Sequence, residues 1–342
     1  MKRGIPWDAS FLHFLIGANM SVYIHGGLRI PIGVLHGQYR NMRPEMLGAQ
    51  LINELINRYD ISQVDGIFCG NAVGTGGNIG RLMGLMTNLP NSVPGITVDM
   101  QCASALMSIE MAYTHIASGV MDSAIAGGIE SSSLQPDRMY AAGDNREGLY
   151  KVAQFSPNDC SPLAMLEGAE RTIQKHNVLK EDLYPYIIGS HQRAIEALDN
   201  PYLQSYIMPI TIDGKACVDE CIRPKMNEKL LSRMKPLLGP NSITNAGNAC
   251  LTHDGAAFVY VSNEKGPFRI HSIMPWAGNP QFSPEGALES TEAILKRTGL
   301  TMDDIDVVEW NEAFAIIDVL FNKAYPKHLE KYNKLGGALA YG

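Results

Sequence analysis

The sequence predicts an α/β protein whose core is built from two similar halves, with a region of different character inserted between them. Short apolar runs alternate with helical patterns, and Gly95–Gly128 shows a strand, a turn, a helix and a second strand. A helix followed by a strand ending in Asn71 recurs about 240 residues later, where the strand ends in Asn311. Repeated α/β halves favour two parallel or mixed sheets packed in layers. Residues 130–240 break the pattern and form the predicted insert.

The composition is that of a globular protein and excludes several classes of function. The 342 residues are 45% hydrophobic and 18% charged, with a net charge of −7, which argues against a nucleic-acid partner. The 6 cysteines are scattered without zinc-ligand spacing, so we expect free thiols in a reducing, cytoplasmic compartment and no metal site. No apolar run is long enough to cross a bilayer, so we expect no membrane partner.

The start of the chain does not fit the core pattern. A basic pair followed by an apolar patch is similar to a secretory signal, but Asp8 and His13 interrupt the apolar stretch. The first convincing strand begins after Met20, which could itself be the start of the protein. We therefore expect residues 1–20 to be an N-terminal extension without a role in the fold.

The first half begins with short strands and one strong helical pattern. Residues 44–59 carry large aliphatic side chains on one face at helical spacing. The glycine-rich stretch at 70–80 has neither a dinucleotide-binding nor a P-loop pattern, so we interpret it as a loop and helix entry. The expected elements, in order, are a strand at 21–24, a loop at 28–37, the helix at 44–59 and a strand at 64–69.

Cys102 lies where the central helix of this half begins. Apolar residues recur at helical spacing from 105 to 116, and Gly119 can end the helix in a left-handed conformation. Because the opposite face is also apolar, we expect the helix to be buried on both sides, between two sheets. The unpaired N–H groups of a helix start favour an anion, so a thiol there should ionise more easily and act as a nucleophile. A buried cysteine in a tight turn is the alternative interpretation.

The insert and the second half follow a strand expected at 123–126. The insert has helical patterns at 164–175 and 188–198 and many basic side chains. We interpret these charges as a solvated face, with a clamp on the phosphates of a nucleotide-containing substrate as the alternative. Core character returns at 243–262, where a Gly/Asn/Asp loop leads into an apolar strand. The later expected elements are a strand at 268–276, a helix at 284–298, a strand at 305–309 and a helix at 313–324.

Several motifs, in this order along the chain, resemble those of the thiolase family over residues 21–342. The segment DMQCASALMSIEMA resembles the family's nucleophile motif, and NEAFA at Asn311–Ala315 matches a family motif letter for letter. NAGNACLTHDGAA, MLEGAE and NKLGGALAYG resemble further family segments. The resemblance implies a layered αβαβα core. It divides the chain into a first half (21–129 and 241–265), an inserted loop domain that binds acyl-CoA (130–240) and a second half (266–342).

The resemblance also implies the chemistry of the site. Thiolases make or break a carbon–carbon bond between acyl-CoA units, by Claisen condensation or thiolysis, and Cys102 would carry the acyl group as a thioester. Asn311 would hold a water or orient a donor that stabilises the enolate oxygen, and the Cys102 N–H would serve a second oxyanion. The implied substrate-binding positions are Met165, Cys250 and Phe314. Coenzyme A thioesters are then substrates, no cofactor is expected, and the chain should form a homodimer or homotetramer.

The sequence departs from the family pattern near its carboxyl end. The family's His-Pro histidine, which activates the nucleophilic cysteine, and its second catalytic cysteine would follow residue 342, so we expect the second half to be incomplete. Cys250 replaces a family serine, and His253 replaces a family asparagine. Two alternatives to a thiolase-type acyltransferase remain. One is a non-catalytic subunit that binds acyl-CoA or a partner, and the other is a remnant that forms only the Cys102 thioester.

Overall fold

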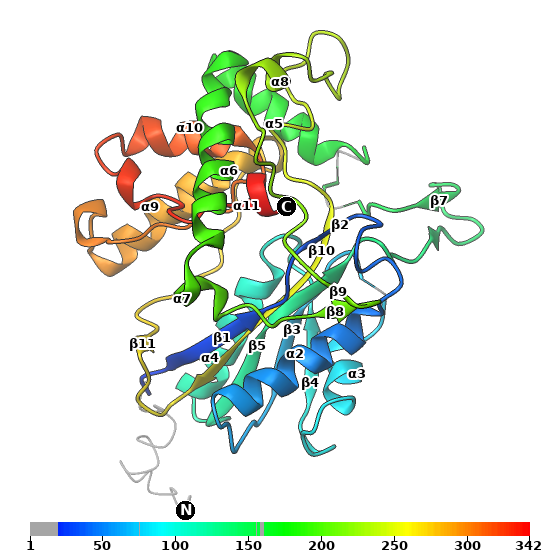
Figure 1. Cartoon of the computed structure of the whole chain (residues 1–342), viewed down its shortest axis with the longest axis vertical. Helices are drawn as coiled ribbons and strands as arrows, with labels where there is room; N and C mark the ends of the chain where they lie inside the picture. Colours follow the sequence, from blue (N-terminus) through cyan, green and yellow to red (C-terminus); the bar gives the residue numbers. More distant parts are fainter. Residues whose placement is uncertain (1–19, 75, 155, 158–160) are drawn as a thin grey trace, which may run out of the picture. The chain divides into compact units, whose positions relative to one another are not determined.

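The computed structural model describes residues 20–342, apart from 75, 155 and 158–160. All but the last residue of the predicted N-terminal extension therefore lies outside the described residues. The chain divides into two compact units (Figure 1). The first unit contains the described residues up to Arg29, together with Met42–Glu130 and Ala256–Ile273; the second contains Ile30–Asn41, Ser131–Gly255 and Met274–Gly342. The domain boundaries implied by the family resemblance stay a prediction.

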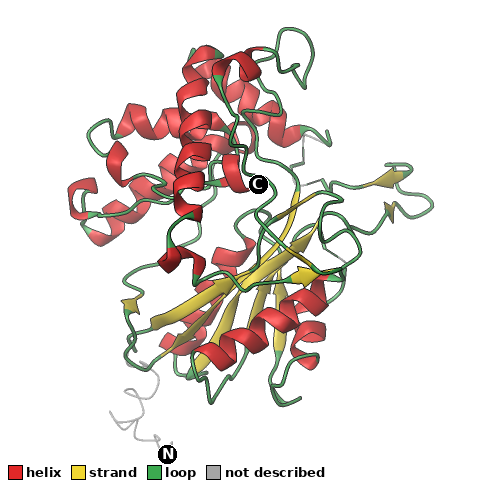
Figure 2. Cartoon of the chain, viewed as in Figure 1, coloured by secondary structure: helices red, strands yellow, loops and turns green. Residues whose placement is uncertain are grey.

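A mixed sheet of seven strands dominates the β structure of the described residues (Figure 2). Its order is β11 (Phe268–Arg269), β1 (Tyr23–Arg29), β10 (His253–Ser262), β5 (Ser123–Ser131), β3 (Ile67–Gly70) and β4 (Gly95–Val98), and β2 (Gly33–Val34) pairs with β10. The strands β4 and β5 both run parallel to β3, whereas β1 is antiparallel to β10 and β11. The carboxyl ends of β3, β4 and β5 therefore meet at one edge of the sheet.

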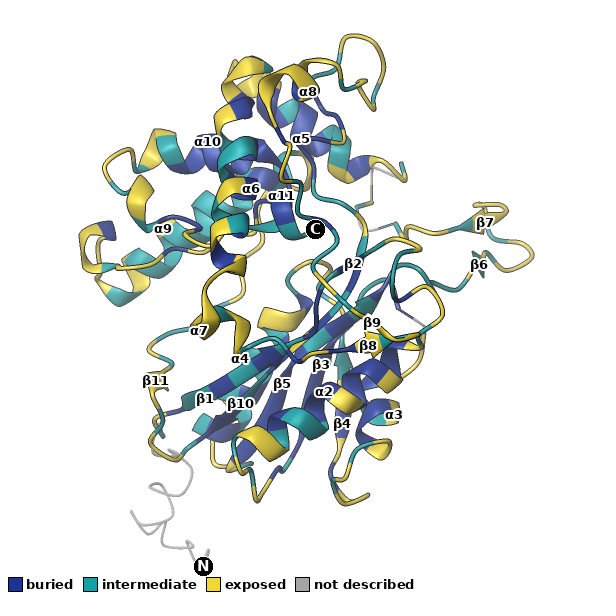
Figure 3. Cartoon of the chain, viewed as in Figure 1, coloured by how far each residue is buried: buried dark blue, intermediate teal, exposed yellow. Residues whose placement is uncertain are grey.

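The helix that follows Cys102, α4 (Ser104–Ala117), packs on this sheet through a row of small residues. Ser108 is fully buried, and its hydroxyl donates to the Gly127 carbonyl at 2.7 Å and accepts from the Gly127 N–H at 2.8 Å. Ala112 and Ile116 enter the same core cluster as Phe68. Figure 3 shows β3 and β5, the strands beneath this cluster, as buried along most of their length.

The environment of α4 corrects one expectation and confirms another. The buried positions of α4 are Ser104, Ser108, Ala112 and Ile116, which recur every four residues on one side. Leu106 is 66% exposed, so the expectation of burial on both sides is wrong: no second sheet covers the outer face among the described residues. Gly119 follows the helix with φ of 75°, which confirms the predicted left-handed end.

The described part of the first unit also contains the helices α2 (Pro44–Arg58) and α3 (Ile79–Leu85). The helix α2 matches the pattern predicted for 44–59 and packs against β1 and α3. Between the end of β3 at Gly70 and the start of α3 at Ile79, the described residues of the glycine-rich stretch have no regular secondary structure, as expected for a loop and helix entry.

The second unit is mainly helical around its own core. Its longer helices are α5 (Ala164–Lys175), α6 (Tyr184–Leu198), α9 (Gly286–Thr298) and α10 (Ala315–Ala324). Shorter helical pieces are η1 (Glu181–Leu183), α7 (Pro201–Gln204), α8 (Glu228–Ser232), η2 (Pro280–Glu285), η3 (Met302–Asp304), η4 (Leu329–Lys331) and α11 (Ala338–Tyr341). Two small hairpins join β6 (Arg138–Met139) to β7 (Leu149–Tyr150) and β8 (Thr211–Ile212) to β9 (Lys215–Ala216). The most buried helix is α10, in which every residue from Ala315 to Phe321 is buried.

Two predicted strands of the second half are wrong or shortened. Residues 305–309 contain a bend at Asp306 and make only an isolated bridge, between Val308 and Tyr332. A strand needs a ladder of partners, and the described residues supply one contact here. The strand expected at 268–276 is reduced to the two residues of β11, which pair with β1. The expected helices at 164–175, 188–198, 284–298 and 313–324 are confirmed as α5, α6, η2 with α9, and α10.

Glu170 on α5 is a buried acid that holds the chain just before the NAGNAC segment. Its carboxylate is 7% exposed and accepts hydrogen bonds from the N–H groups of Ile243 (3.0 Å) and Thr244 (2.8 Å) and from the Thr244 hydroxyl (2.7 Å). If the carboxylate is removed, no water can replace it as the acceptor for the buried Thr244 donors. The residue therefore ties α5 to the loop that leads into β10.

Replacing Glu170 with alanine is expected to lower the free energy of unfolding by about 2–3 kcal/mol, because it leaves buried donors without an acceptor. Urea unfolding followed by circular dichroism measures this change as a lower midpoint. Glu167→Ala on the same helix is the matched control. Its side chain is 33% exposed, accepts from the Ser161 hydroxyl at 2.9 Å and forms a long ion pair of 3.9 Å with Arg171, so the loss should stay below about 1 kcal/mol. Equal losses in the two variants would contradict the prediction.

Candidate active site

Cys102 lies at the edge of the sheet where ligands bind in many α/β proteins. It follows the carboxyl end of β4 and precedes the first residue of α4. The carboxyl ends of β3 and β5 meet at the same edge, and crevices outside such strand ends are the usual ligand sites of open α/β sheets. Cys102 is exposed, so a second reactant can reach its sulfur.

The turn around Cys102 is held tightly by its neighbours. The Ser104 hydroxyl accepts from the Met100 N–H at 2.8 Å and donates to the Gln101 carbonyl at 2.6 Å. The Gln101 N–H donates to the Asp99 carboxylate at 3.0 Å. Gln101 has φ of 52°, a left-handed conformation that costs a non-glycine residue energy and persists where surrounding contacts enforce it. These contacts fix the cysteine in one place before any substrate binds.

The ionisation of Cys102 runs against the expectation drawn from its helix position. Desolvation raises the pKa of the Cys102 thiol above its ordinary value, a hydrogen bond from its own N–H lowers it, and the charge of Glu130 raises it again. Water still reaches this exposed residue, which limits the desolvation. The Ala103 and Ser104 N–H groups donate to the Met100 and Gln101 carbonyls instead of the sulfur. The expected easier ionisation is therefore wrong, because desolvation and the Glu130 charge oppose the thiolate while two of the helix-end amides are already occupied.

Glu130 is a charged neighbour of Cys102 that was not among the site residues predicted from the sequence. It lies at the carboxyl end of β5, and its carboxylate accepts from the N–H groups of Ala72 (2.9 Å), Val73 (2.8 Å) and Gly74 (3.0 Å) and from the Asn71 amide (3.0 Å). Successive backbone N–H groups of this kind form an anion-binding concavity. The signal in the sequence was an acid directly after Gly127-Gly128-Ile129.

Replacing Glu130 with glutamine is expected to lower the pKa of the Cys102 thiol, because a nearby negative charge that opposes the thiolate is removed. The pH profile of iodoacetamide alkylation at Cys102, followed by peptide mass, should shift to lower pH. Glu110→Gln removes the same charge further along α4 and should leave the profile in place. An unchanged profile in the Glu130 variant would show that its charge does not act on the thiol.

Asn311 lies in the second unit, in a turn directly before α10. The residue is exposed, and its carbonyl accepts from the Ala313 N–H at 2.8 Å. The neighbouring Trp310 is held by Asn333, whose side chain accepts from the Trp310 N–H at 2.9 Å and donates to the Trp310 carbonyl at 3.0 Å. Glu312 points the other way and is fully buried. The turn therefore presents the Asn311 amide to solvent from a rigid backbone.

The structure brings Cys250 and Phe314 to the same segment as Asn311. The Cys250 N–H donates to the Ala313 carbonyl at 2.8 Å, and Ala249 forms a bridge with Phe314. Phe314 is only 6% exposed and belongs to the hydrophobic core of the second unit. Cys250 is half-buried. The two motifs that are far apart in the sequence thus form one local structure.

Met165 lies in the first turn of α5 and is not part of the local structure formed by Cys250, Phe314 and the Asn311 turn. It is 37% exposed, and its sulfur lies 4.0 Å from the Ser283 hydroxyl on η2. Cys102, by contrast, belongs to the first unit, and the other four predicted site residues belong to the second.

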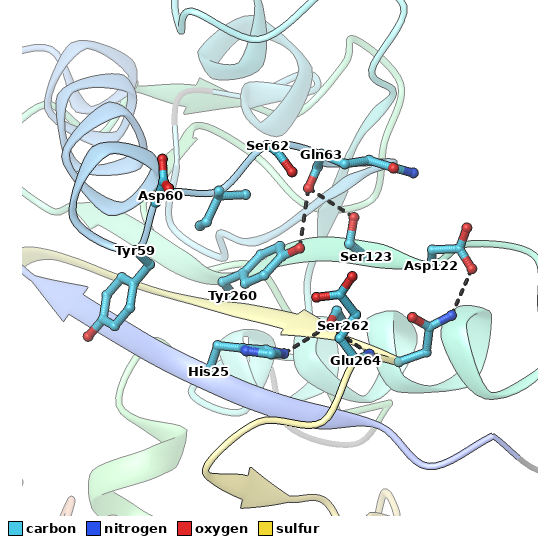
Figure 4. A pocket seen from close by; sticks show the side chains of 12 residues that line it. His25, Tyr59, Asp60, Ser62, Gln63, Asp122, Ser123, Tyr260, Ser262 and Glu264 are labelled. Atoms are coloured by element: carbon cyan, nitrogen blue, oxygen red, sulfur yellow. Dashed lines mark hydrogen bonds between the residues drawn. The ribbon is translucent and has the colours of Figure 1, made fainter.

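A separate pocket of about 270 Å³ lies in the first unit, beside the amino end of β5 (Figure 4). A hydrogen bond of 2.8 Å links the Nε2 atom of His25 to the Ser262 hydroxyl. The Ser123 hydroxyl donates to the Gln63 carbonyl at 3.0 Å. Tyr260 lies between them and also donates to Gln63, at 3.4 Å. Ser123 begins β5, so this pocket is at the end of the parallel strands opposite to Cys102. Several of its polar groups are hydrogen-bonded to one another, and we do not assign it to the candidate active site.

No helix in the part of the chain that the structure describes is long and apolar enough to cross a membrane.

Two domains of one known protein family match nearly the whole described chain. Residues 22–265 match the family described as the N-terminal domain of thiolase, and residues 268–342 match the C-terminal domain. A proposed acetyl-CoA C-acetyltransferase of Staphylococcus epidermidis, VraB, is 32% identical over 92% of this chain and 86% of its own length. The VraB protein of Staphylococcus aureus strain MW2 is 31% identical over the same shares.

Two solved structures share the fold. The crystal structure of a Bacillus anthracis acetyl-CoA acetyltransferase has a TM-score of 0.87 and 24% identity, covering 95% of this chain and 88% of that one. The human mitochondrial 3-ketoacyl-CoA thiolase, solved in complex with CoA, has a TM-score of 0.85 and 23% identity, covering 95% and 87%. At these identities the likeness bears on the fold alone.

Proposed function

The chain belongs to the thiolase family and is a thiolase-type acyl-CoA acyltransferase with a thiolase-like α/β fold, and from this premise we propose that Cys102 is its acyl-carrying nucleophile. One observation carries the proposal. Cys102 is an exposed thiol in a strained, hydrogen-bonded turn at the carboxyl edge of three parallel strands. Its motif, DMQCASALMSIEMA, is also the segment that resembles the family's nucleophile motif.

The proposed reaction passes through a thioester on Cys102. In thiolysis the Cys102 sulfur attacks the 3-keto carbonyl of a 3-ketoacyl-CoA, and the bond between the α- and β-carbons breaks. The electron pair leaves with acetyl-CoA as its enolate, which takes up the proton that the thiol lost. The sulfur of CoA then attacks the acyl-cysteine, releases a shortened acyl-CoA and returns its own proton to Cys102. Claisen condensation is the same sequence in reverse.

Oxyanion stabilisation is the role proposed for Asn311 and for the Cys102 N–H. Asn311 would hold a water, or orient a donor, at the enolate oxygen of acetyl-CoA, and its exposed amide on a rigid turn supports this role. Substrate contact is proposed for Met165, Cys250 and Phe314. Phe314 is buried, so its contribution would be to shape the wall behind Cys250.

The proposed partners follow from the family. We expect the protein to bind coenzyme A and its acyl thioesters; the human 3-ketoacyl-CoA thiolase was solved in complex with CoA. A homodimer or homotetramer and a cytoplasmic location belong to the same proposal. Gel filtration with light scattering measures the first of these directly.

Intact-mass analysis after mixing with acetyl-CoA tests the proposed function. We expect the mass to rise by one acetyl group, and peptide mapping to place that group on Cys102. Adding free CoA should then remove it, because the second half of the reaction transfers the acyl group to CoA. Acetylation at another cysteine, or no acetylation of a protein that circular dichroism shows to be folded, would contradict the proposal.

A further inference from the structure

Two acids lie deep in the core of the second unit, directly behind the Asn311 turn. Asp318 is in the first turn of α10, and Glu312 comes just before that helix. Both are 0% exposed, and they are surrounded by a core cluster that includes Trp310, Phe321 and Tyr332. Acids are almost never buried to this extent unless they are paired, because removing a charge from water costs several kcal/mol.

The hydrogen bonds around these acids leave three carboxyl oxygens without a donor. The Ser190 hydroxyl on α6 donates to one Glu312 oxygen in a short contact, and the Gly337 N–H donates to Ser190 at 3.1 Å. The second Glu312 oxygen, both Asp318 oxygens and the Tyr332 hydroxyl make no hydrogen bond of ordinary geometry, although Asp318 lies close enough to Glu312 and Tyr332 for both to shift its pKa. Two adjacent carboxylates have no hydrogen to offer each other. A proton on one of them would supply the missing donor.

The charges around Asp318 favour that proton. Burial raises the pKa of Asp318 well above its usual range, and the neighbouring Glu312 carboxyl raises it further, whereas Tyr332 and Arg193 on α6 lower it. Burial and Asp318 also raise the pKa of Tyr332, so its phenol stays protonated. The other titratable groups that face the pair are Glu309, beside Glu312, and Tyr186 on α6.

A bound metal ion is not a competing explanation for the pair. Among the described residues, no group of three or more histidine, cysteine, aspartate or glutamate side chains is placed to hold one. Two like charges at this depth also cannot both ionise without separating. The geometry therefore favours a carboxylic acid facing a carboxylate.

We propose that Asp318 is a positioning residue, which keeps its proton at neutral pH, donates it to Glu312 and thereby fixes the turn that carries Asn311. The inference rests on the role proposed above for Asn311. Asn333 holds the backbone on one side of Asn311, at Trp310. Glu312 is the anchor on the other side: the Ser190 hydroxyl donates to one of its oxygens, and the proposed proton of Asp318 would donate to the other. Losing that proton would set two buried carboxylates against each other and displace the residue next to Asn311.

The first arm of the test measures the proton through stability. A group whose pKa is higher in the folded than in the unfolded state stabilises fully below about pH 4, the unfolded value, and this stability is lost as pH rises toward the folded value. The unfolding equilibrium constant of the parent should therefore rise by up to about tenfold per pH unit relative to Asp318→Asn. The asparagine keeps the shape and a donor but does not titrate. Asp306→Asn, at an exposed aspartate of the same unit, should show the parent's pH dependence.

The second arm measures positioning through turnover of acetoacetyl-CoA and CoA. Asp318→Asn should keep kcat within about threefold of the parent, because its amide N–H still donates to Glu312. Asp318→Ala should lower kcat about tenfold or more with little change in KM, because the substrate-binding residues stay while the Asn311 turn shifts. Circular dichroism confirms that each protein is folded at the assay temperature.

Three results would overturn the proposal. A stability profile of Asp318→Asn that follows the parent would show that Asp318 holds no extra proton. Parental kcat in folded Asp318→Ala would show that the acid pair supports stability without positioning Asn311. A parent that turns over no acetoacetyl-CoA would overturn the proposed function and the positioning role with it, while the stability arm still decides whether Asp318 carries the proton.

Discussion

Replacing Cys102 with alanine is expected to lower the rate of acetoacetyl-CoA thiolysis at least about a thousandfold, because the thioester intermediate can no longer form. The thiol is the only group in its turn with the nucleophilicity for this step. The neighbouring Ser104 hydroxyl is occupied by the Met100 N–H and the Gln101 carbonyl. The decrease in the enolate absorbance of acetoacetyl-CoA, with CoA present, measures the rate.

Cys217→Ser is the matched control for this experiment. Cys217 is a second partly exposed thiol, in the other unit, and it lies beside the Tyr39 hydroxyl. Its loss should leave the rate within about twofold of the parent, since it contacts none of the proposed site residues. Comparable rates in the parent and the Cys102 variant would show that the reaction does not pass through this cysteine.

Replacing Asn311 with aspartate is expected to lower kcat for thiolysis by about 10²–10³-fold, which is the usual cost of removing one oxyanion donor. The side chain keeps its size but loses the amide and gains a negative charge where negative charge develops. The single acetyl group transferred from acetyl-CoA to Cys102 should survive this change, because forming that thioester creates no enolate. Thiolysis kinetics and intact mass on the same sample separate the two effects.

Asn41→Asp, at an exposed asparagine, should change neither measurement and controls for added surface charge. Loss of both the acetyl adduct and thiolysis in the Asn311 variant would mean that this residue supports the Cys102 step itself. Loss of neither would remove Asn311 from the proposed mechanism.

Local pattern was enough to predict most of the elements that carry the candidate site. The helix expected at 164–175 is α5 with the same bounds, and Gly119 ends α4 in the left-handed conformation. Both follow from interactions within about four residues, such as helical periodicity and a glycine free to adopt positive φ. The prediction of a strand at 305–309 was wrong because a strand depends on a partner segment that can be distant in the sequence. Within 305–309, only Val308 forms a bridge with one.

The direction of the Cys102 pKa shift also could not be predicted from the local sequence pattern. Its place before α4 was correctly predicted, but the N–H groups that would have favoured a thiolate are taken by Met100 and Gln101. Glu130, which acts on the thiol from the end of β5, is 28 positions away in the sequence. A pKa depends on the charges and water around a group, and these come from segments that only the fold brings together.

The sequence by itself determined the family, the α/β class, and the identity of the two residues proposed for the chemistry, Cys102 and Asn311. Those conclusions rest on ordered motifs and on periodicity, which are properties of contiguous residues. Only the tertiary structure decided what surrounds each residue. Asp318 follows NEAFA by three residues in the sequence, and only the fold places it in the core beside Glu312. In our proposal, burial makes Asp318 keep a proton and share it with Glu312, because a charge far from water has a high free energy.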